Sequence, residues 1–272
     1  MSKKIILITG ASSGMGKITA ESLAHQGHIV YGAARRVEPM KSLVSKGGKA
    51  LSLDITKEES VVSAVSQVIR EQGRIDVLIN NAGFGLYGAV EDTTIDDARY
   101  QLEVNLLGLG RLTQLVLPYM RQQKAGTIIN ISSMGGKIYT HLGAWYHATK
   151  HALEGWSDCL RLETKDFGIN VVVVEPGIIN TDFGNVMTDP MLKRSENTAY
   201  GPLAKRVAKA TSESYKPGGG SDPMVIANTI SKIIKSSRPK TRYAVGKFAK
   251  ILIFVRKWFG DKIYDKAVMS QV

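Results

Sequence analysis

The chain has 272 residues, of which 43% are hydrophobic, and its formal net charge at pH 7 is +12. This composition is that of a globular protein with a buried core, in one α/β domain or two smaller ones. The single cysteine, Cys159, excludes a disulfide within the chain and a cysteine-rich metal site, so no metal is expected. Cys159 lies in an apolar helical pattern, which predicts a small buried side chain.

Neither a signal peptide nor a membrane span is expected. The first apolar run ends at Thr9 and Gly10, well short of the apolar core of a secretory signal. No stretch approaches the ~20 apolar residues of a membrane-spanning helix, so we expect a soluble, cytoplasmic protein. The positive charge is concentrated from Lys232 onwards, where the chain has eleven Lys and Arg residues and only two acidic residues, Asp261 and Asp265. This excess favours a solvated basic face over contact with nucleic acid or an anionic membrane.

Short apolar runs alternate with helical patterns along most of the chain. The runs predict strands at residues 4–9, 28–33, 50–53, 75–79, 127–131, 170–174 and 242–245. The helical patterns cover about residues 17–26, 57–72, 95–122, 146–167 and 223–236. Such alternation implies parallel strands joined by right-handed crossovers. The predicted fold class is therefore α/β, a Rossmann-type doubly wound parallel sheet of about seven strands with helices on both faces.

One domain is expected at residues 1–246, with a basic amphipathic appendage at residues 247–272. Residues 178–222 are expected to be irregular or weakly helical. Apolar residues of the appendage recur at helical spacing and form one stripe, composed of Phe248, Ile251, Leu252, Val255, Trp258 and Phe259. The stripe must be covered by the body of the chain, a second subunit or a bilayer interface. We favour packing against protein, with peripheral membrane contact through residues 247–259 as the alternative.

A glycine-rich turn joins the first predicted strand to the first predicted helix. It contains Gly10, Ser12, Ser13, Gly14, Met15 and Gly16. Glycines let the backbone approach a pyrophosphate, and the following helix offers unpaired N–H groups to it. A phosphate-binding P-loop is disfavoured, because Ile18 follows Lys17 and Ala11 replaces the first required glycine. The turn therefore indicates a dinucleotide site.

Polar residues at the ends of the next strands support a dinucleotide. Asp54 and Asn81 follow the third and fourth predicted strands, at the sheet edge where ligands bind. A helix N-cap is an equal alternative for Asp54. Arg35 and Arg36 follow the second strand, where a carboxylate would select a ribose hydroxyl and a cation selects a 2′-phosphate. We therefore expect a preference for NADP(H), with NAD(H) possible.

Tyr146 and Lys150 are spaced four residues apart, and Ser133 lies thirteen residues upstream of Tyr146. Side chains at this spacing share one face of a helix. A nearby cation lowers the pKa of a phenol from its usual ~10, towards the range of general acid–base chemistry. Tyr243 and Lys247 have the same spacing but are interpreted as a strand end and the start of a surface helix. The upstream residues distinguish the two pairs.

Taken together, these motifs resemble the short-chain dehydrogenase/reductase family over about residues 4–181. The turn that starts at Thr9 matches the family's cofactor motif, and Asn80–Gly83 matches its Asn-Asn-Ala-Gly motif. The resemblance assigns cofactor contacts to the turn and to Arg35, Arg36, Asp54, Ile55, Asn81, Ala82, Gly83, Tyr146, Lys150, Pro176, Gly177, Ile179 and Thr181. It assigns catalysis to Asn105, Ser133, Tyr146 and Lys150.

The resemblance also implies a mechanism. Tyr146 exchanges a proton with the substrate oxygen, and Ser133, in preference to Ser132, orients that oxygen. Lys150 is expected to hold the nicotinamide ribose and to lower the pKa of Tyr146, while Asn105 supports a water that connects Lys150 to solvent. His147 and His151 point away from the Tyr146 face of the helix and are interpreted as surface residues.

The predicted activity is therefore an NADP-dependent oxidoreductase that interconverts a carbonyl and an alcohol, acting on a hydrophobic substrate. Residues 178–222 correspond to the family's substrate lid, and an apolar pocket is expected from Leu86, Tyr87, Ile138, Tyr139, Leu142, Ile179 and Phe183. The alternatives are a non-catalytic NADP(H)-binding redox sensor and a basic protein associated with membranes or nucleic acid. The family implies a homodimer or homotetramer, and no nucleic-acid partner is expected.

Overall fold

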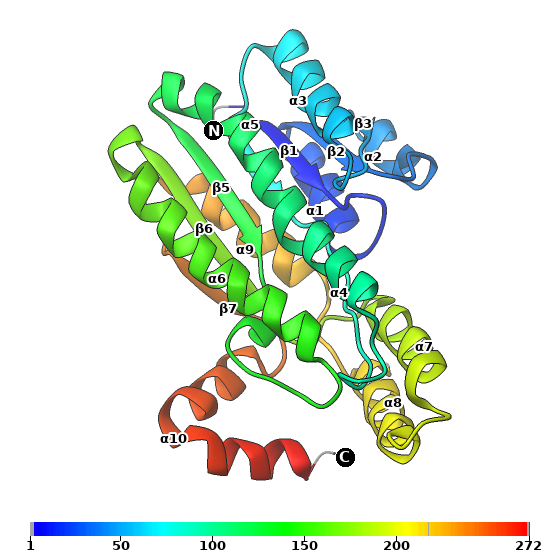
Figure 1. Ribbon diagram of the computed structural model, residues 1–272. Coiled ribbons are helices and arrows are strands. Elements are labelled where there is room, and N and C mark those ends of the chain that lie inside the picture. The colour runs from blue at the N-terminus through cyan, green and yellow to red at the C-terminus, as the bar shows by residue number, and fades with distance from the viewer. Residues whose placement is uncertain (1–2, 217, 271) are drawn as a thin grey trace.

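A computed structural model describes residues 3–216, 218–270 and 272. It contains one seven-stranded sheet in the order β3-β2-β1-β4-β5-β6-β7, and every adjacent pair of strands is parallel (Figure 1). The strands are β1 (Ile5–Thr9), β2 (Ile29–Ala34), β3 (Lys49–Ser52), β4 (Val77–Asn80), β5 (Gly126–Ile131), β6 (Ile169–Pro176) and β7 (Arg242–Val245). The predicted fold class is confirmed.

Helices cover both faces of this sheet. The helices of the described chain are α1 (Gly14–His25), α2 (Lys41–Ser45), α3 (Glu58–Gln72), α4 (Ile95–Leu102), α5 (Gly108–Gln123), α6 (Ala144–Thr164), α7 (Phe183–Ser195), α8 (Gly201–Tyr215), α9 (Met224–Lys235) and α10 (Ala249–Met269), of which α7, α8 and α10 lie beyond the end of the sheet (Figure 1). Apolar residues of α3, α5 and α6 form a core with one face, and those of α1, α2 and α9 form a second core with the other. The domain thus has the three layers of a doubly wound fold.

The central strand β1 shows why its residues read as one continuous apolar run. Leu7 packs into the first core, and Ile6 and Ile8 pack into the second. All three side chains have 0% exposure. Because successive side chains of a strand point to opposite faces, a strand covered on both sides needs apolar residues at every position. Full burial of each such side chain contributes about 1.5–3 kcal/mol.

A buried side-chain network joins the two strands beside the site. The Asn80 side-chain amide at the end of β4 donates to Asn130 Oδ1 of β5 at 2.9 Å and to Thr113 Oγ1 of α5 at 3.1 Å. Asn130 Nδ2 donates in turn to Ser157 Oγ of α6 at 2.9 Å. The network therefore fixes β4, β5 and two helices relative to one another just below the edge where the site lies.

Two predictions about helices need correction. The helix predicted at residues 95–122 contains a π-helical turn, η2 (Glu103–Leu107), between α4 and α5. Residues 178–222, predicted to be irregular or weakly helical, form α7 and α8, which pack against each other. The helix α7 was not predicted because it contains Pro190 and its apolar residues are sparse. Position 217 of this segment, residues 1 and 2 of the predicted domain and position 271 of the appendage lie outside the described residues.

The prediction that Cys159 is buried is wrong. The buried positions in this half of α6 are Leu153, Glu154, Ser157, Leu160 and Thr164, and Cys159 lies between them on the exposed side. The apolar residues around Cys159 therefore did not show which way its side chain points. Neighbouring positions on a helix differ by about 100° of rotation, so a residue next to buried positions can itself be exposed.

The apolar stripe of the appendage is not covered by the body of the chain. Phe248, Ile251, Trp258 and Phe259 are exposed in α10 and at its N-cap, so the favoured prediction fails for contacts within one chain. The helix bends at Gly260, whose φ of 68° is not helical, and its second half packs on the body through the buried Tyr264. None of the described helices is long and apolar enough to cross a bilayer.

Candidate active site

The glycine-rich turn between β1 and α1 presents bare backbone. Gly10 has φ of 68°, a conformation that favours glycine. A Cβ atom on Gly16 would lie 2.3 Å from both Asn81 Nδ2 and Gly10 O, so no side chain fits there. Ser13 is the N-cap of α1 and makes no side-chain cap bond, and Ser12 and Met15 flank the turn. The first N–H groups of α1 are therefore available to an anion.

Asn81 connects this turn to the end of β4. Its side-chain amide donates to Thr9 O at 2.9 Å, and its backbone N–H donates to Thr9 Oγ1 at 3.1 Å. Ala82 N also donates to Thr9 Oγ1, at 3.0 Å. Gly83 follows, and a Cβ atom there would lie 3.1 Å from Asn105 Oδ1 and 3.8 Å from Lys150 Nζ. The loop that was predicted to contact a cofactor thus also fixes the glycine turn and approaches Lys150.

Two arginines and a carboxylate follow β2 and β3, at the same edge of the sheet as the glycine-rich turn. Arg35 and Arg36 are exposed after β2, and Arg35 Nη1 donates to Tyr100 OH at 3.1 Å. Burial would raise the pKa of Asp54, but hydrogen bonds from Thr56 outweigh it, and with Arg35 they lower that pKa. The N-cap of α3 is residue 57, so the alternative N-cap role of Asp54 is wrong. Ile55 is buried beside it.

Tyr146 and Lys150 are both buried on α6, with exposures of 8% and 7%. Burial raises the pKa of Tyr146, and the Ser133 hydroxyl is the group that opposes this effect. Lys150 Nζ donates to Ile131 O at 2.9 Å and does not act on the Tyr146 pKa. The net shift of the Tyr146 pKa is therefore upward, opposite to the lowering that was expected from Lys150.

Burial also changes the Lys150 ammonium itself. It lowers the Lys150 pKa to about 8, and Glu154, one helical turn further on, acts in the opposite direction. Glu154 is buried and is itself paired, with Lys137 Nζ and with Arg242 Nε, each at 3.0 Å from its Oε2. Lys150 thus exchanges its proton closer to neutral pH than an exposed lysine does.

Asn105 lies in the π-helical turn and is 1% exposed. Its side-chain nitrogen donates to Phe84 O at 2.9 Å and to Thr149 Oγ1 at 3.2 Å, and its oxygen accepts from Phe84 N at 3.1 Å. The side chain is therefore committed to the loop after β4 and to α6. Single π-helical turns occur often at functional sites. Here the π-helical turn directs the Asn105 amide inward, where it bonds both the loop after β4 and α6.

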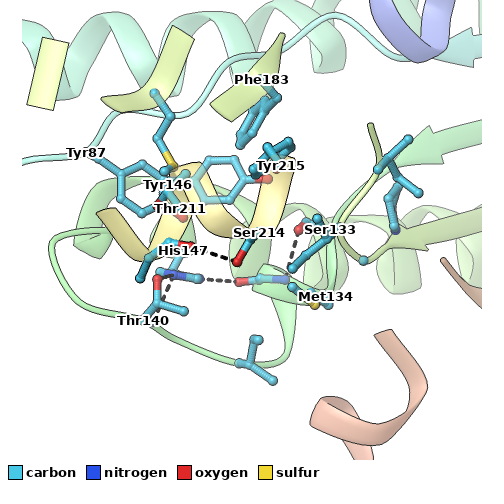
Figure 2. Close-up of a pocket in the computed structure, with 18 of the residues that line it drawn as sticks. Tyr87, Ser133, Met134, Thr140, Tyr146, His147, Phe183, Thr211, Ser214 and Tyr215 are labelled. Atoms are coloured by element: carbon cyan, nitrogen blue, oxygen red, sulfur yellow. Dashed lines mark hydrogen bonds between the residues drawn. The ribbon is translucent and has the colours of Figure 1, made fainter. Parts of the chain in front are cut away.

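A cavity adjoins Tyr146 and Ser133 (Figure 2). Pro176 lines it from the end of β6, Gly177, Ile179 and Thr181 line it from the loop that follows, and Met15 lines it from the first turn of α1. The remaining wall is mostly apolar and comes largely from α7, α8 and the loop before α6, through Met134, Ile138, Phe183, Met187, Val207, Ala210 and Tyr215. The structure thus brings the predicted catalytic hydroxyls and several of the predicted cofactor contacts to one cavity.

The predicted pocket residues divide into two groups. Tyr87, Ile138, Ile179 and Phe183 line the cavity, and the ring centroids of Tyr87 and Phe183 lie 5.7 and 5.9 Å from that of Tyr146. The other three do not line it, namely Leu86, Tyr139 and Leu142. Tyr139 instead packs under α10.

The sequence interpretation missed His147. It was predicted at the surface but is buried and lines the cavity, whereas His151 is exposed as expected. Thr140 N–H donates to His147 Nε2 at 3.0 Å, so Nε2 is the acceptor and Nδ1 carries the proton that it donates to Gly135 O at 2.9 Å. The neutral ring therefore ties both ends of the loop between Ser133 and α6 to the helix.

Known proteins are similar to this chain in sequence and in fold. The short chain dehydrogenase family matches residues 4–191. A 3-ketodihydrosphingosine reductase of Bacteroides thetaiotaomicron is 41% identical over 271 residues, which cover 98% of this chain and 97% of the relative. A short-chain dehydrogenase from Streptomyces avermitilis has a TM-score of 0.80 at 34% identity, with 99% of each chain covered. A closed serine dehydrogenase complexed with NADP+ has a TM-score of 0.77 at 26% identity, over 89% of this chain and 94% of the other.

The chain belongs to the short-chain dehydrogenase family. It is an oxidoreductase of that family.

We predict that His147 makes stability depend on pH. Burial lowers the His147 pKa below 6.5 in the folded protein, so at lower pH the unfolded chain binds a proton that the folded chain does not. Stability should fall as pH drops through about 6.5 towards the folded pKa. His147→Gln should reduce this slope, measured as urea midpoints between about pH 8 and pH 5.

The exposed His151 provides the control, because His151→Gln should leave the slope unchanged. The pKa of the buried His28 is also lowered, so His28 should contribute equally to the pH dependence of stability in every variant. A slope equal to that of the wild type in His147→Gln would mean that His147 binds its proton equally in both states.

Proposed function

We propose that this oxidoreductase uses NADPH, in preference to NADH, to reduce a ketone that carries a long apolar chain. The observation that carries the proposal is the cavity, in which two hydroxyl groups, those of Ser133 and Tyr146, adjoin a largely apolar wall. Such a site can bind one carbonyl oxygen by hydrogen bonds and an alkyl chain by burial. The relative named 3-ketodihydrosphingosine reductase supports the same substrate class, a ketone on a long chain.

The sheet edge at the glycine-rich turn suits a dinucleotide cofactor. A pyrophosphate can approach the turn because side chains are excluded from Gly16, and the first turn of α1 contains no acidic residue to repel it. The exposed Arg35 and Arg36 can pair with a 2′-phosphate. Gly177 and Thr181 line the cavity, the Thr181 side chain lies next to Gly14 of the turn, and Lys150 lies beside Gly83. When bound, the nicotinamide supplies the hydride in reduction and accepts it in oxidation.

In the proposed reaction, Tyr146 gives its phenolic proton to the substrate oxygen while Ser133 donates a hydrogen bond to the same oxygen. Burial raises the pKa of Tyr146, so the phenol is protonated at neutral pH and has the proton that reduction requires. Burial lowers the Lys150 pKa to about 8, so Lys150 can pass on a proton near neutral pH to replace the one that Tyr146 gives up. Asn105 positions the loop and the helix that hold these groups.

Exposed apolar residues also lie on the central helices. Leu107 at the start of α5 and Leu162 on α6 are 56% and 65% exposed. They support the proposal that the protein is a homodimer or homotetramer, with the subunits in contact through these helices.

We predict that Tyr146→Phe lowers kcat at least about a hundredfold, the usual contribution of a positioned general acid. The substitution removes the hydroxyl and keeps the ring that packs between Tyr87 and Phe183, so the Kd for NADPH should not change. The measurements are loss of NADPH absorbance with a ketone and titration of NADPH binding. Tyr243→Phe is the control, because its hydroxyl accepts a hydrogen bond from Lys240 N far from the cavity. Tyr146→Phe with wild-type kcat would show that another group supplies the proton.

We predict that the wild type binds NADPH about tenfold to a hundredfold more tightly than NADH, the effect of one charge-assisted bidentate contact. Arg35→Ala should remove most of this difference and leave the NADH affinity unchanged. Tyr100→Phe removes the hydroxyl that accepts from Arg35 and retains the guanidinium, so it should keep most of the preference. Equal wild-type affinities for the two cofactors would contradict the assignment.

The substrate class is tested with straight-chain ketones of increasing length, with and without a neighbouring amino group. We expect kcat/KM with NADPH to rise about threefold to fourfold per methylene, or ~0.8 kcal/mol, until the chain fills the cavity. Ala210→Phe narrows the cavity and should lower kcat/KM for long ketones more than for short ones. Lys209→Phe, at the exposed neighbouring position, is the matched control. Values of kcat/KM that do not depend on chain length would contradict the proposal.

A further inference from the structure

The two halves of α10 have different surroundings. After the bend at Gly260, Tyr264 is 1% exposed, its hydroxyl donates to Tyr139 O at 3.1 Å, and its ring lies 5.0 Å from that of Tyr139. Tyr139 OH donates to Asp265 at 2.7 Å. Val268, near the end of the helix, lines the substrate cavity. The second half of α10 is therefore fixed to the body beside the cavity, at the lower end of the molecule in Figure 1.

The first half of α10 presents an uncovered apolar face. Ile251, Phe254 and Trp258 are 59%, 54% and 66% exposed, and their spacing of three and four residues places them on one side of the helix. The opposite side faces the body, where Arg256 lies over the Tyr139 ring at 5.1 Å. Three large apolar side chains in a row on an exposed helix mark a surface that contacts something else.

Lysines border this face. Lys250 and Lys257 are seven residues apart, on one edge of the face, and neither forms a salt bridge within the described residues. Lys257 Nζ lies 5.3 Å from the centroid of the Trp258 ring. Of the two acidic residues in the helix, Asp261 pairs with Arg256 and Asp265 accepts from Tyr139. The edge therefore carries uncompensated positive charge beside aromatic groups, which suits a partner that is apolar inside and negative at its surface.

We propose that the Ala249–Phe259 part of α10 docks on a negatively charged membrane surface. Ile251, Phe254 and Trp258 enter the boundary between headgroups and acyl chains, and Lys250 and Lys257 contact the anionic headgroups. A second copy of the chain fits less well, because the two acidic residues that its own α10 could offer to these lysines are already paired with Arg256 and Tyr139. The inference stands on α10 alone and goes beyond the proposed reaction. Docking in this way places the cavity wall at Val268 next to the bilayer.

The test is sedimentation of the full-length protein with vesicles of phosphatidylcholine alone or mixed with phosphatidylglycerol. We expect binding to the mixed vesicles that weakens with added salt, and little binding to the neutral vesicles. The fluorescence of Trp258 should shift to shorter wavelength on binding. Trp258→Phe should keep binding and lose this shift, since the chain's other two tryptophans, Trp145 and Trp156, lie on α6.

Matched variants separate this face from nonspecific adsorption. Phe254→Ser with Trp258→Ser, and separately Lys250→Glu with Lys257→Glu, should each weaken vesicle binding about tenfold or more. Val44→Ser with Val62→Ser removes two exposed apolar residues elsewhere and should have no effect. Lys232→Glu with Lys235→Glu on α9 changes the net charge equally and should retain most of the binding.

Three results would overturn the proposal. The first is wild-type protein that stays in solution with the mixed vesicles. The second is equal binding by the variants of α10 and by their controls. The third is a dimer, seen by light scattering, that Phe254→Ser with Trp258→Ser converts to monomers in a protein that does not bind vesicles. That result would assign the face to a second copy of the chain.

Discussion

The site depends on one buried hydrogen bond between two strands. Asn80 and Asn130 are opposite each other in the register of β4 and β5 and share a bond of 2.9 Å. Each amide also bonds a helix, at Thr113 and Ser157. Because a buried polar group without a partner costs about 1–3 kcal/mol, these four side chains favour one register. The loops that follow the two strands, which hold Gly83 and Ser133, therefore leave the sheet at fixed points.

Burial then sets the charges within the site. It raises the pKa of Tyr146 and lowers the pKa values of Lys150 and His147, so all three groups are shifted towards their neutral forms. The neutral His147 can accept from one backbone group and donate to another, which an imidazolium could not do. The burial of these three side chains thus accounts both for the direction of their pKa shifts and for the neutral His147 ring that bonds the loop after Ser133.

The sequence was sufficient for the parts of the protein that follow a simple period. Strands buried on both faces are continuous apolar runs, and the groups at their ends were identified because parallel strands share an edge. His147 was missed because helix geometry places it off the Tyr146 face but says nothing of a loop that folds back over it. Apart from Phe183, the residues of α7 and α8 that line the cavity were not predicted, for a related reason. They are buried by contacts between segments, which no local pattern in residues 178–222 records.

The π-helical turn at Asn105 sets the phase between two helices that otherwise run continuously. With 3.6 residues per turn, one residue corresponds to about 100° of rotation. Deletion of a single residue between Glu103 and Leu107 would restore regular α-helix and rotate α4 by about that angle relative to α5. Tyr100 would then turn away from Arg35, although the sheet and its core would be untouched. The extra residue thus sets the rotation between α4 and α5. It lets one continuous helix pack against the sheet through α5 and present Tyr100 of α4 to Arg35.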